Sequence, residues 1–113
     1  MSNCIFCKIA NKEIQSNIVY ENEDIIAFED LQPQAPVHIL IIPKKHIESA
    51  DDITDENKNI MGEVFLAANK IAREKNLSNG YRIVNNCKED GGQTVDHIHF
   101  HLLGGRKLQW PPG

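Results

Sequence analysis

The chain has 113 residues, of which 41% are hydrophobic and 25% charged, values typical of a folded soluble domain, so we expect residues 1–113 to form one domain without disulfides. The formal net charge of −4 excludes proteins that bind nucleic acid broadly along its backbone, because that requires clustered cations. Residues 1–4 do not begin a targeting signal, and the longest aliphatic run, residues 39–42, is too short to span a membrane, so we expect a cytoplasmic protein without membrane contact.

The first half of the sequence predicts a short helix and three strands. Residues 5–9 carry apolar side chains at helical spacing. Two short apolar runs, 18–20 and 25–28, flank a polar turn and predict a β-hairpin. Two prolines make 31–36 a loop, and the β-branched run 37–42 predicts a central strand that Pro43 ends.

The second half predicts one long helix and two further strands. The helix has an apolar stripe at intervals of three and four, formed by Ile60, Val64, Ala67, Ala68 and Ile71. Thr54 or Asp55 caps its start, and Asn76 with residues 79–80 ends it. Strands are expected over 81–85 and about 95–103, followed by an extended tail over 110–113. The chain is therefore predicted to have an α+β fold with a five-stranded, mainly antiparallel sheet, one long helix and a short N-terminal helix.

Three histidines alternate with apolar residues in the last predicted strand. Side chains alternate across a strand, so His97, His99 and His101 share one face, and His38 lies in the apolar run 37–42. The face can be solvated and without function, or it can bind a metal through its His-x-His pairs. In the third interpretation one histidine is a nucleophile whose neighbours manage protons, a chemistry that suits a side chain largely neutral at physiological pH.

A glycine-containing segment, residues 90–94, leads directly into this strand. Glycines allow backbone N–H groups to approach an anion, and Thr94 adds a hydroxyl. A lone Gly-Gly pair is usually only a turn. Next to three histidines on one face, it favours a phosphate cradle and therefore phosphoryl or nucleotidyl transfer, although the spacing does not distinguish these two.

Several motifs, in order, resemble the histidine triad family, and specifically its nucleotide-binding branch of purine nucleoside phosphoramidases. They include Pro33-Gln34-Ala35-Pro36-Val37-His38, Gly91-Gly92-Gln93-Thr94-Val95-x-His97-x-His99-x-His101-Leu102-Leu103-Gly104-Gly105-Arg106, and Trp110-Pro111-Pro112-Gly113. The related dinucleoside polyphosphate hydrolases share the triad but look less similar after His101 and in the tail.

This resemblance implies a hydrolase that cleaves nucleoside 5′-phosphoramidates or related nucleoside monophosphate conjugates through a covalent intermediate. His99 is then the nucleophile that takes the nucleotide, and His101 contacts the phosphate and helps the leaving amine acquire its proton. His38 is expected behind the triad, holding His99 in its tautomer. Two rival hypotheses remain: a nucleotide-binding regulatory or scaffold protein with little turnover, and a metalloenzyme with zinc held by the triad itself.

The resemblance also implies a nucleotide site and a homodimer whose two sheets join. Asp30 is expected to bind the ribose hydroxyls, and Asn86 to reach the phosphate or sugar. The phosphate is lined by Gly92, Gln93 and Thr94, and a purine such as adenine or guanine by an apolar slot of Ile5, Phe6, Ile9, Phe28 and Leu31. Each slot residue taken alone fits ordinary core packing equally well. Trp110 is expected near the partner's active site.

The pair Cys4-x-x-Cys7 is half of a tetrahedral zinc site. The resemblance implies His46 and His97 as the other two ligands, and four protein ligands would make the zinc structural. Two unpaired thiols or a redox pair are the alternatives, although no thioredoxin-like pattern surrounds the cysteines.

Two residues have no expected role in the chemistry. Cys87 looks like an ordinary free cysteine. Asp96 stands where family members more often carry an apolar or aromatic residue, and it is expected to face away from the histidines and to weaken sheet packing or mark an exposed edge.

Overall fold

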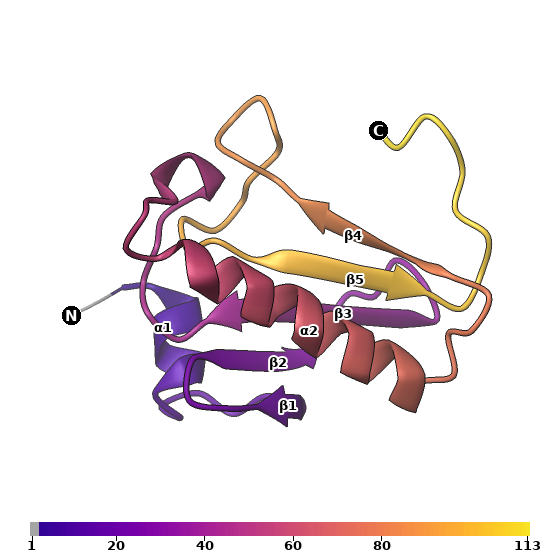
Figure 1. The fold of residues 1–113 in the computed structure, drawn as a ribbon, viewed down its shortest axis with the longest axis horizontal. Coiled ribbons are helices and arrows are strands. Elements are labelled where there is room, and N and C mark those ends of the chain that lie inside the picture. The colour runs from indigo at the N-terminus through magenta and orange to yellow at the C-terminus, as the bar shows by residue number, and fades with distance from the viewer. Residues whose placement is uncertain (1–2) are drawn as a thin grey trace.

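A computed structural model describes residues 3–113, which form two α-helices, one short 3-10 helix and five strands (Figure 1). The elements are α1 Ile5–Ala10, β1 Ile18–Glu21, β2 Ile25–Glu29, β3 Val37–Pro43, η1 Ala50–Asp52, α2 Lys58–Glu74, β4 Tyr81–Asn85 and β5 Phe100–Gly104. The strands form one antiparallel sheet in the order β1-β2-β3-β5-β4, as the α+β prediction requires. None of the helices within residues 3–113 combines the length and the apolar character that a membrane crossing requires.

The sheet separates the two helices. On one face, α2 packs over a core that includes Ile39, Ile41 and, from β5, Phe100 and Leu102. On the other face, Phe6 and Ile9 of α1 pack against the alternate residues of the same strands, namely Ile26, Phe28, Leu40 and Ile42. Both faces of the central strands are therefore buried, which explains why residues 37–42 are almost entirely apolar.

The predicted stripe of α2 is confirmed, because Val64, Ala67, Ala68 and Ile71 are at most 1% exposed. The predicted start is wrong by about three residues. Asn57 is the residue before the helix, and its Oδ1 accepts a hydrogen bond from the Thr54 N–H at 2.7 Å, so residues 54–57 form a turn instead of the first helical turn. The predicted end is confirmed by Asn76, whose φ of +61° takes the chain out of the helix.

The last strand is shorter than predicted. It begins at Phe100, not near Val95, and it extends one residue further, to Gly104. The cause lies in the neighbouring strand: the register that pairs Ile41 with Phe100 would pair Pro43 with Ile98, and proline has no N–H to donate to the ladder. The Ile98 N–H bonds instead to the carbonyl of Ile47. Residues 97–99 thus leave the sheet but keep the alternation, since Ile98 is buried in the core under α2.

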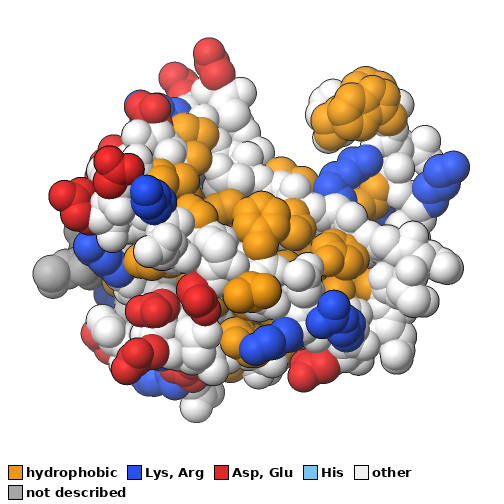
Figure 2. Space-filling view, viewed as in Figure 1, with side chains coloured by type: hydrophobic (Ala, Val, Ile, Leu, Met, Phe, Trp, Pro, Cys, Tyr) orange, Lys and Arg blue, Asp and Glu red, His pale blue; other side chains and the backbone are white. Residues whose placement is uncertain are grey.

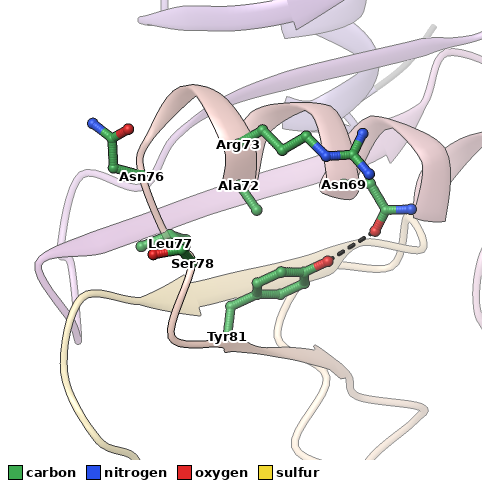
Figure 3. A pocket seen from close by; sticks show the side chains of 7 residues that line it. All are labelled: Asn69, Ala72, Arg73, Asn76, Leu77, Ser78 and Tyr81. Carbon is green, nitrogen blue, oxygen red and sulfur yellow. Dashed lines mark hydrogen bonds between the residues drawn. The ribbon is translucent and has the colours of Figure 1, made fainter.

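A depression of about 360 Å³ lies between the C-terminal part of α2 and β4 (Figure 3). Its rim includes Arg73 and Ser78, and the Tyr81 hydroxyl donates a hydrogen bond to Oδ1 of Asn69 at 2.8 Å across it. The depression is on the α2 side of the sheet, whereas the histidines described next lie on the α1 side.

Candidate active site and metal centre

Four histidines gather on the face of the sheet that α1 covers. The rings of His99 and His101 lie 5.2 Å apart between centroids, and the same distance separates His38 from His101. Phe6 of α1 places its ring edge-on against His99 at 5.1 Å. His99 is 4% exposed and His38 is 7% exposed, so both rings are sheltered by protein. The predicted sharing of one face is confirmed.

Backbone carbonyls determine which nitrogen carries the proton in two of these rings. Nδ1 of His99 lies 2.8 Å from the carbonyl oxygen of His97. Because a carbonyl only accepts, Nδ1 of His99 must donate, and the lone pair of the neutral ring is on Nε2. In the same way, Nε2 of His97 donates to the carbonyl of Pro43 at 2.8 Å, which leaves the lone pair of His97 on Nδ1.

A backbone N–H determines the position of the proton in the other two rings. The Gln34 N–H donates to Nδ1 of His38 at 3.0 Å, so the proton of neutral His38 is on Nε2. That Nε2 lies 2.9 Å from Nδ1 of His101 and donates to it. The neutral His101 ring therefore carries its proton on Nε2. His38 thus contacts His101, which corrects the expectation that it holds His99; the His97 carbonyl does that.

Both rings of this pair are held in the neutral form by their surroundings. Burial, together with the smaller effects of the neighbouring His99 and His38, lowers the pKa of His101 from 6.5 to about 4, against an opposing effect of the Asp30 carboxylate. Burial also lowers the pKa of His38, against an opposing effect of the Asp30 carboxylate. A neutral His101 offers its Nε2–H as a hydrogen-bond donor at physiological pH, whereas proton transfer to a leaving group requires the imidazolium form.

Asn85, at the end of β4, is a site residue that the sequence interpretation missed. Its Nδ2 donates to the carbonyl of His99 at 2.9 Å. This bond fixes the main chain at the point where residues 97–99 have left the ladder. Asn85 precedes the predicted site residue Asn86, and its position at the end of the predicted strand 81–85 was the only available signal.

The glycine segment is built differently from the predicted cradle. The N–H groups of Gly92 and Gln93 already donate to the carbonyls of Glu89 and Lys88, at 3.0 Å each, so they do not form an open nest. Gly92 has a φ of +80°, which explains the need for glycine there. Thr94, beyond this turn, is exposed.

The two amide side chains predicted to line the phosphate make contacts within the protein. Nδ2 of Asn86 donates to the carbonyl of Gly91 at 2.6 Å, and Nε2 of Gln93 donates to the carbonyls of Glu48 and Val95. These bonds shape residues 86–94 into a fixed loop. Contact of either side chain with a phosphate stays a prediction.

The five residues of the predicted purine slot line one cavity of about 360 Å³. They are Ile5, Phe6, Ile9, Phe28 and Leu31, and Ile14 and Leu40 join them. Leu31 is 92% exposed, whereas a core residue would be buried, so the alternative of ordinary core packing does not apply to Leu31. Since Phe6 contacts His99, the cavity adjoins the histidines.

Polar groups are few along this cavity, and Asp30 is one of them. One carboxylate oxygen of Asp30 accepts a bond from the Gln32 N–H at 2.7 Å, and the other lies 3.5 Å from Nε2 of His38. The hydroxyl of Ser16, which also lines the cavity, is the buried side-chain polar atom within residues 3–113 that has no hydrogen-bond partner. Sequence reasoning did not find Ser16, because a serine between two predicted elements carries no signal.

Cys4, Cys7, His46 and His97 come together as predicted. Nδ1 of His97 lies 3.3 Å from Sγ of Cys4, 3.5 Å from Sγ of Cys7 and 3.2 Å from Nδ1 of His46. Tetrahedral zinc with Zn–N of about 2.0 Å and Zn–S of about 2.3 Å separates its ligands by roughly 3.3–3.8 Å. The donor set and its spacing fit that ion. The lone pair of His97, left on Nδ1 by the Pro43 carbonyl, points at the same centre.

A second group, Asp30, His38 and His101, also brings three ligand atoms within 4.8 Å of one another. The position of the proton on His38 argues against a metal ion bound by this group. Because the Gln34 N–H occupies Nδ1 of His38, a metal at Nε2 would require the imidazolate, a far stronger base than neutral imidazole. The three histidines of the triad are also divided, since His97 belongs to the cysteine group, His101 to this one and His99 to neither. This division counts against a single zinc held by the triad.

The remaining predicted residues lie outside these clusters. Trp110 is 80% exposed in a tail that leaves the sheet beyond β5 (Figure 1), and the preceding carbonyl, that of Gln109, accepts a bond from Arg82 at 2.8 Å. Cys87 is a free cysteine, and Asp96 is exposed, ahead of the strand that it was expected to join.

Comparison with known proteins yields consistent matches. Residues 11–108 match the model of the HIT domain. A HIT-like protein of Buchnera aphidicola is 52% identical over 108 residues, which is 95% of each chain. A HIT family hydrolase from Legionella pneumophila superimposes with a TM-score of 0.96 at 51% identity, covering 98% of this chain and 100% of that one. A histidine triad nucleotide-binding protein from Candida albicans has a TM-score of 0.82 at 33% identity, covering 96% of this chain and 83% of that one.

Proposed function

Because this chain belongs to the HIT domain family, we propose that it is a nucleotide hydrolase that cleaves nucleoside 5′-phosphoramidates and related nucleoside monophosphate conjugates. Among the family's branches, we assign it to the nucleotide-binding phosphoramidases. The proposal rests mainly on one observation: the His97 carbonyl holds the proton of His99 on Nδ1 and so directs the lone pair of Nε2 outward as a nucleophile.

The proposed reaction has two steps. Nε2 of His99 attacks phosphorus, the P–N bond breaks, and the leaving amine takes a proton from the imidazolium form of His101, which the negative charge of the bound phosphate favours. Water then attacks phosphorus in the His99–nucleotide intermediate, the N–P bond breaks, and His101 takes a proton from that water, which restores the imidazolium. The products are an amine and a nucleoside monophosphate. In the neutral His101 of the free protein the proton is on Nε2, the nitrogen proposed to face the leaving group.

We assign the apolar cavity next to His99 to a purine, adenine or guanine. The supporting facts are its walls and its volume of about 360 Å³, which suits a flat apolar ring system. Asp30, at the polar end, is the proposed ligand of the ribose hydroxyls, since a carboxylate accepts two hydrogen bonds. We place the phosphate between His99, His101 and the loop carrying Asn86, Gly92, Gln93 and Thr94.

We propose that Cys4, Cys7, His46 and His97 hold a structural zinc ion. Such an ion would supply a crosslink between three segments, because Cys4 and Cys7 belong to the start of α1, His46 follows β3, and His97 lies in the segment that leads to His99. Burial and the neighbouring Cys4 raise the pKa of the Cys7 thiol to about 11, so a bound cation is needed to make it a thiolate.

We further propose that two copies of the chain form a homodimer through β4 and α2. The outer edge of β4 is an open edge of the sheet, and Phe65 and Leu66 on α2 are 48% and 56% exposed. Hydrophobic side chains gather on this face of the molecule (Figure 2). An exposed edge beside an apolar patch is typical of a surface that another chain covers. In that dimer, Trp110 is proposed to approach the partner's active site.

The alternative is a regulatory or scaffold protein that binds nucleotide with little turnover. The ordered tautomers of four histidines favour the enzyme, because a binding protein has no need of a nucleophilic lone pair beside a second histidine that presents an N–H.

The test is a rapidly quenched reaction with adenosine 5′-phosphoramidate, followed by mass detection of the nucleotidylated protein. Wild type is expected to carry the adduct on His99. His99→Ala should lose it and lose at least about a thousandfold in kcat/KM, because no other group replaces the nucleophile. Binding of adenosine monophosphate should stay within a few fold.

Asp96→Asn is the matched control, since this exposed side chain lies three residues from His99 and is expected to change nothing. Wild-type turnover by His99→Ala would contradict the nucleophile assignment. Nucleotide binding without any turnover by the wild type would favour the regulatory alternative.

A further inference from the structure

We propose that Arg106 is a positioning residue that sets the proton of His101 from outside the active site, by holding the backbone of Gln34. This inference rests on the proposed function of His101 as the acid. Arg106 follows the two glycines that end β5, the strand that carries His101. One of its guanidinium nitrogens donates to the carbonyl oxygen of Gln34 at 2.8 Å.

Gln34 is bonded on both sides of its own backbone. Its carbonyl accepts from Arg106, and its N–H donates to Nδ1 of His38 at 3.0 Å. From there, Nε2 of His38 donates to Nδ1 of His101 at 2.9 Å. The bonds form one directional chain, in which each donor fixes the proton of the next ring. Without the Gln34 N–H, His38 could adopt the other tautomer, and the Nε2 proton of His101 would no longer be specified.

The loop that carries Gln34 also touches the end of β5 directly. A Cβ placed on Gly105 would lie 2.8 Å from Cβ of Pro36, and Gly105 has a φ of +93°, so only glycine allows this approach. The loop is otherwise exposed at Gln32, Pro33 and Gln34. Arg106 therefore links an exposed loop to the strand that bears the acid, and no requirement of core packing explains that link.

The direct test measures where the His38 proton lies and how well the Gln34 amide is protected, and it does not depend on activity. ¹⁵N spectra of the histidine rings report which nitrogen of His38 is protonated, and hydrogen exchange reports protection of the Gln34 amide. In Arg106→Ala, we expect the Gln34 amide to exchange at least about tenfold faster, and His38 to show a second tautomer.

Activity supplies a second readout. Arg106→Ala should lower kcat with adenosine 5′-phosphoramidate by about tenfold while KM changes less than about twofold, since an acid acts in the transition state and not in binding. Arg106→Lys retains a donor and should recover most of the kcat. Lys107→Ala, which removes the neighbouring positive charge, is the matched control and should match wild type in every readout.

The possible outcomes are separable. Wild-type His38 spectra and Gln34 protection in Arg106→Ala overturn the inference, whatever happens to turnover. Equal losses in Lys107→Ala and Arg106→Ala overturn it too, because they would reflect net charge. If His99→Ala remains active, the proposed function fails, yet the spectra still decide whether Arg106 sets the proton of His38.

Discussion

At the scale of single residues, four histidines of similar sequence context are given different chemistry by the groups they face. His97 and His99 each donate to a backbone carbonyl, but through opposite ring nitrogens. One therefore offers Nδ1 to the cysteine cluster and the other offers Nε2 outward. His38 accepts from the N–H of Gln34 through Nδ1, so its proton is on Nε2. The roles follow from three backbone groups, those of Pro43, His97 and Gln34, which no spacing of histidines in a sequence reveals.

The cysteine cluster leads to a prediction at this scale. Purified protein grown with zinc should contain about one equivalent of the metal per chain. Cys4→Ser should lose it and lower Tm by roughly 10 °C, since the loss of a crosslink worth a few kcal/mol has an effect of that size in a small domain. Metal analysis and thermal denaturation measure the two effects.

Cys87→Ser is the control for this experiment, because Cys87 lies outside the cluster and should leave both zinc and Tm unchanged. Zinc that persists in Cys4→Ser would be bound elsewhere and would revive the rival in which histidines alone hold it.

At the scale of elements, the loop of residues 86–94 is held in one shape by its own hydrogen bonds and by close packing at a glycine. A Cβ on Gly91 would collide with the carbonyl oxygen of Cys87 and lie 2.7 Å from the Cys87 nitrogen. Gly91→Ala therefore has to displace the loop that Asn86 anchors. We expect Kd for adenosine monophosphate to rise about tenfold, equivalent to roughly 1.4 kcal/mol, as measured by calorimetry.

Gly62→Ala is the matched substitution, in the interior of α2 with nothing within 4 Å of the added methyl group. It should leave Kd unchanged and stabilise the fold by up to about 1 kcal/mol. An unchanged Kd in Gly91→Ala would mean that the loop does not contact the phosphate.

Elements were predictable where a regular pattern alone determined them. The stripe of α2, the strands β2 and β3 and the face shared by the histidines follow from periodicity, and all are present. The start of β5 was not predictable from its own residues, because Pro43 on another strand ends the ladder there. The start of α2 was misplaced because the Thr54 N–H donates to Oδ1 of Asn57, which holds residues 54–57 in a turn ahead of the helix.

At the scale of the whole molecule, the two faces of the sheet carry different features. The α1 face carries the histidines and the apolar cavity, while the α2 face carries the exposed apolar patch and the open edge of β4. In the proposed dimer, a second copy on the α2 face would leave the proposed nucleotide cavity accessible. This separation would allow one small domain to bind both a partner and a nucleotide.

The dimer proposal predicts that one charge introduced on α2 will prevent association of the two chains. Leu66→Glu places a carboxylate within the exposed apolar patch on α2, and burying an unpaired charge at an interface costs several kcal/mol. The variant should sediment as a monomer, whereas wild type should have the mass of two chains. Ile18→Glu is the matched control, because Ile18 is 40% exposed on β1, the opposite edge of the sheet. If Ile18→Glu dissociates the dimer and Leu66→Glu does not, the sheet is extended through β1, and the proposed place of Trp110 beside the partner's active site is lost as well.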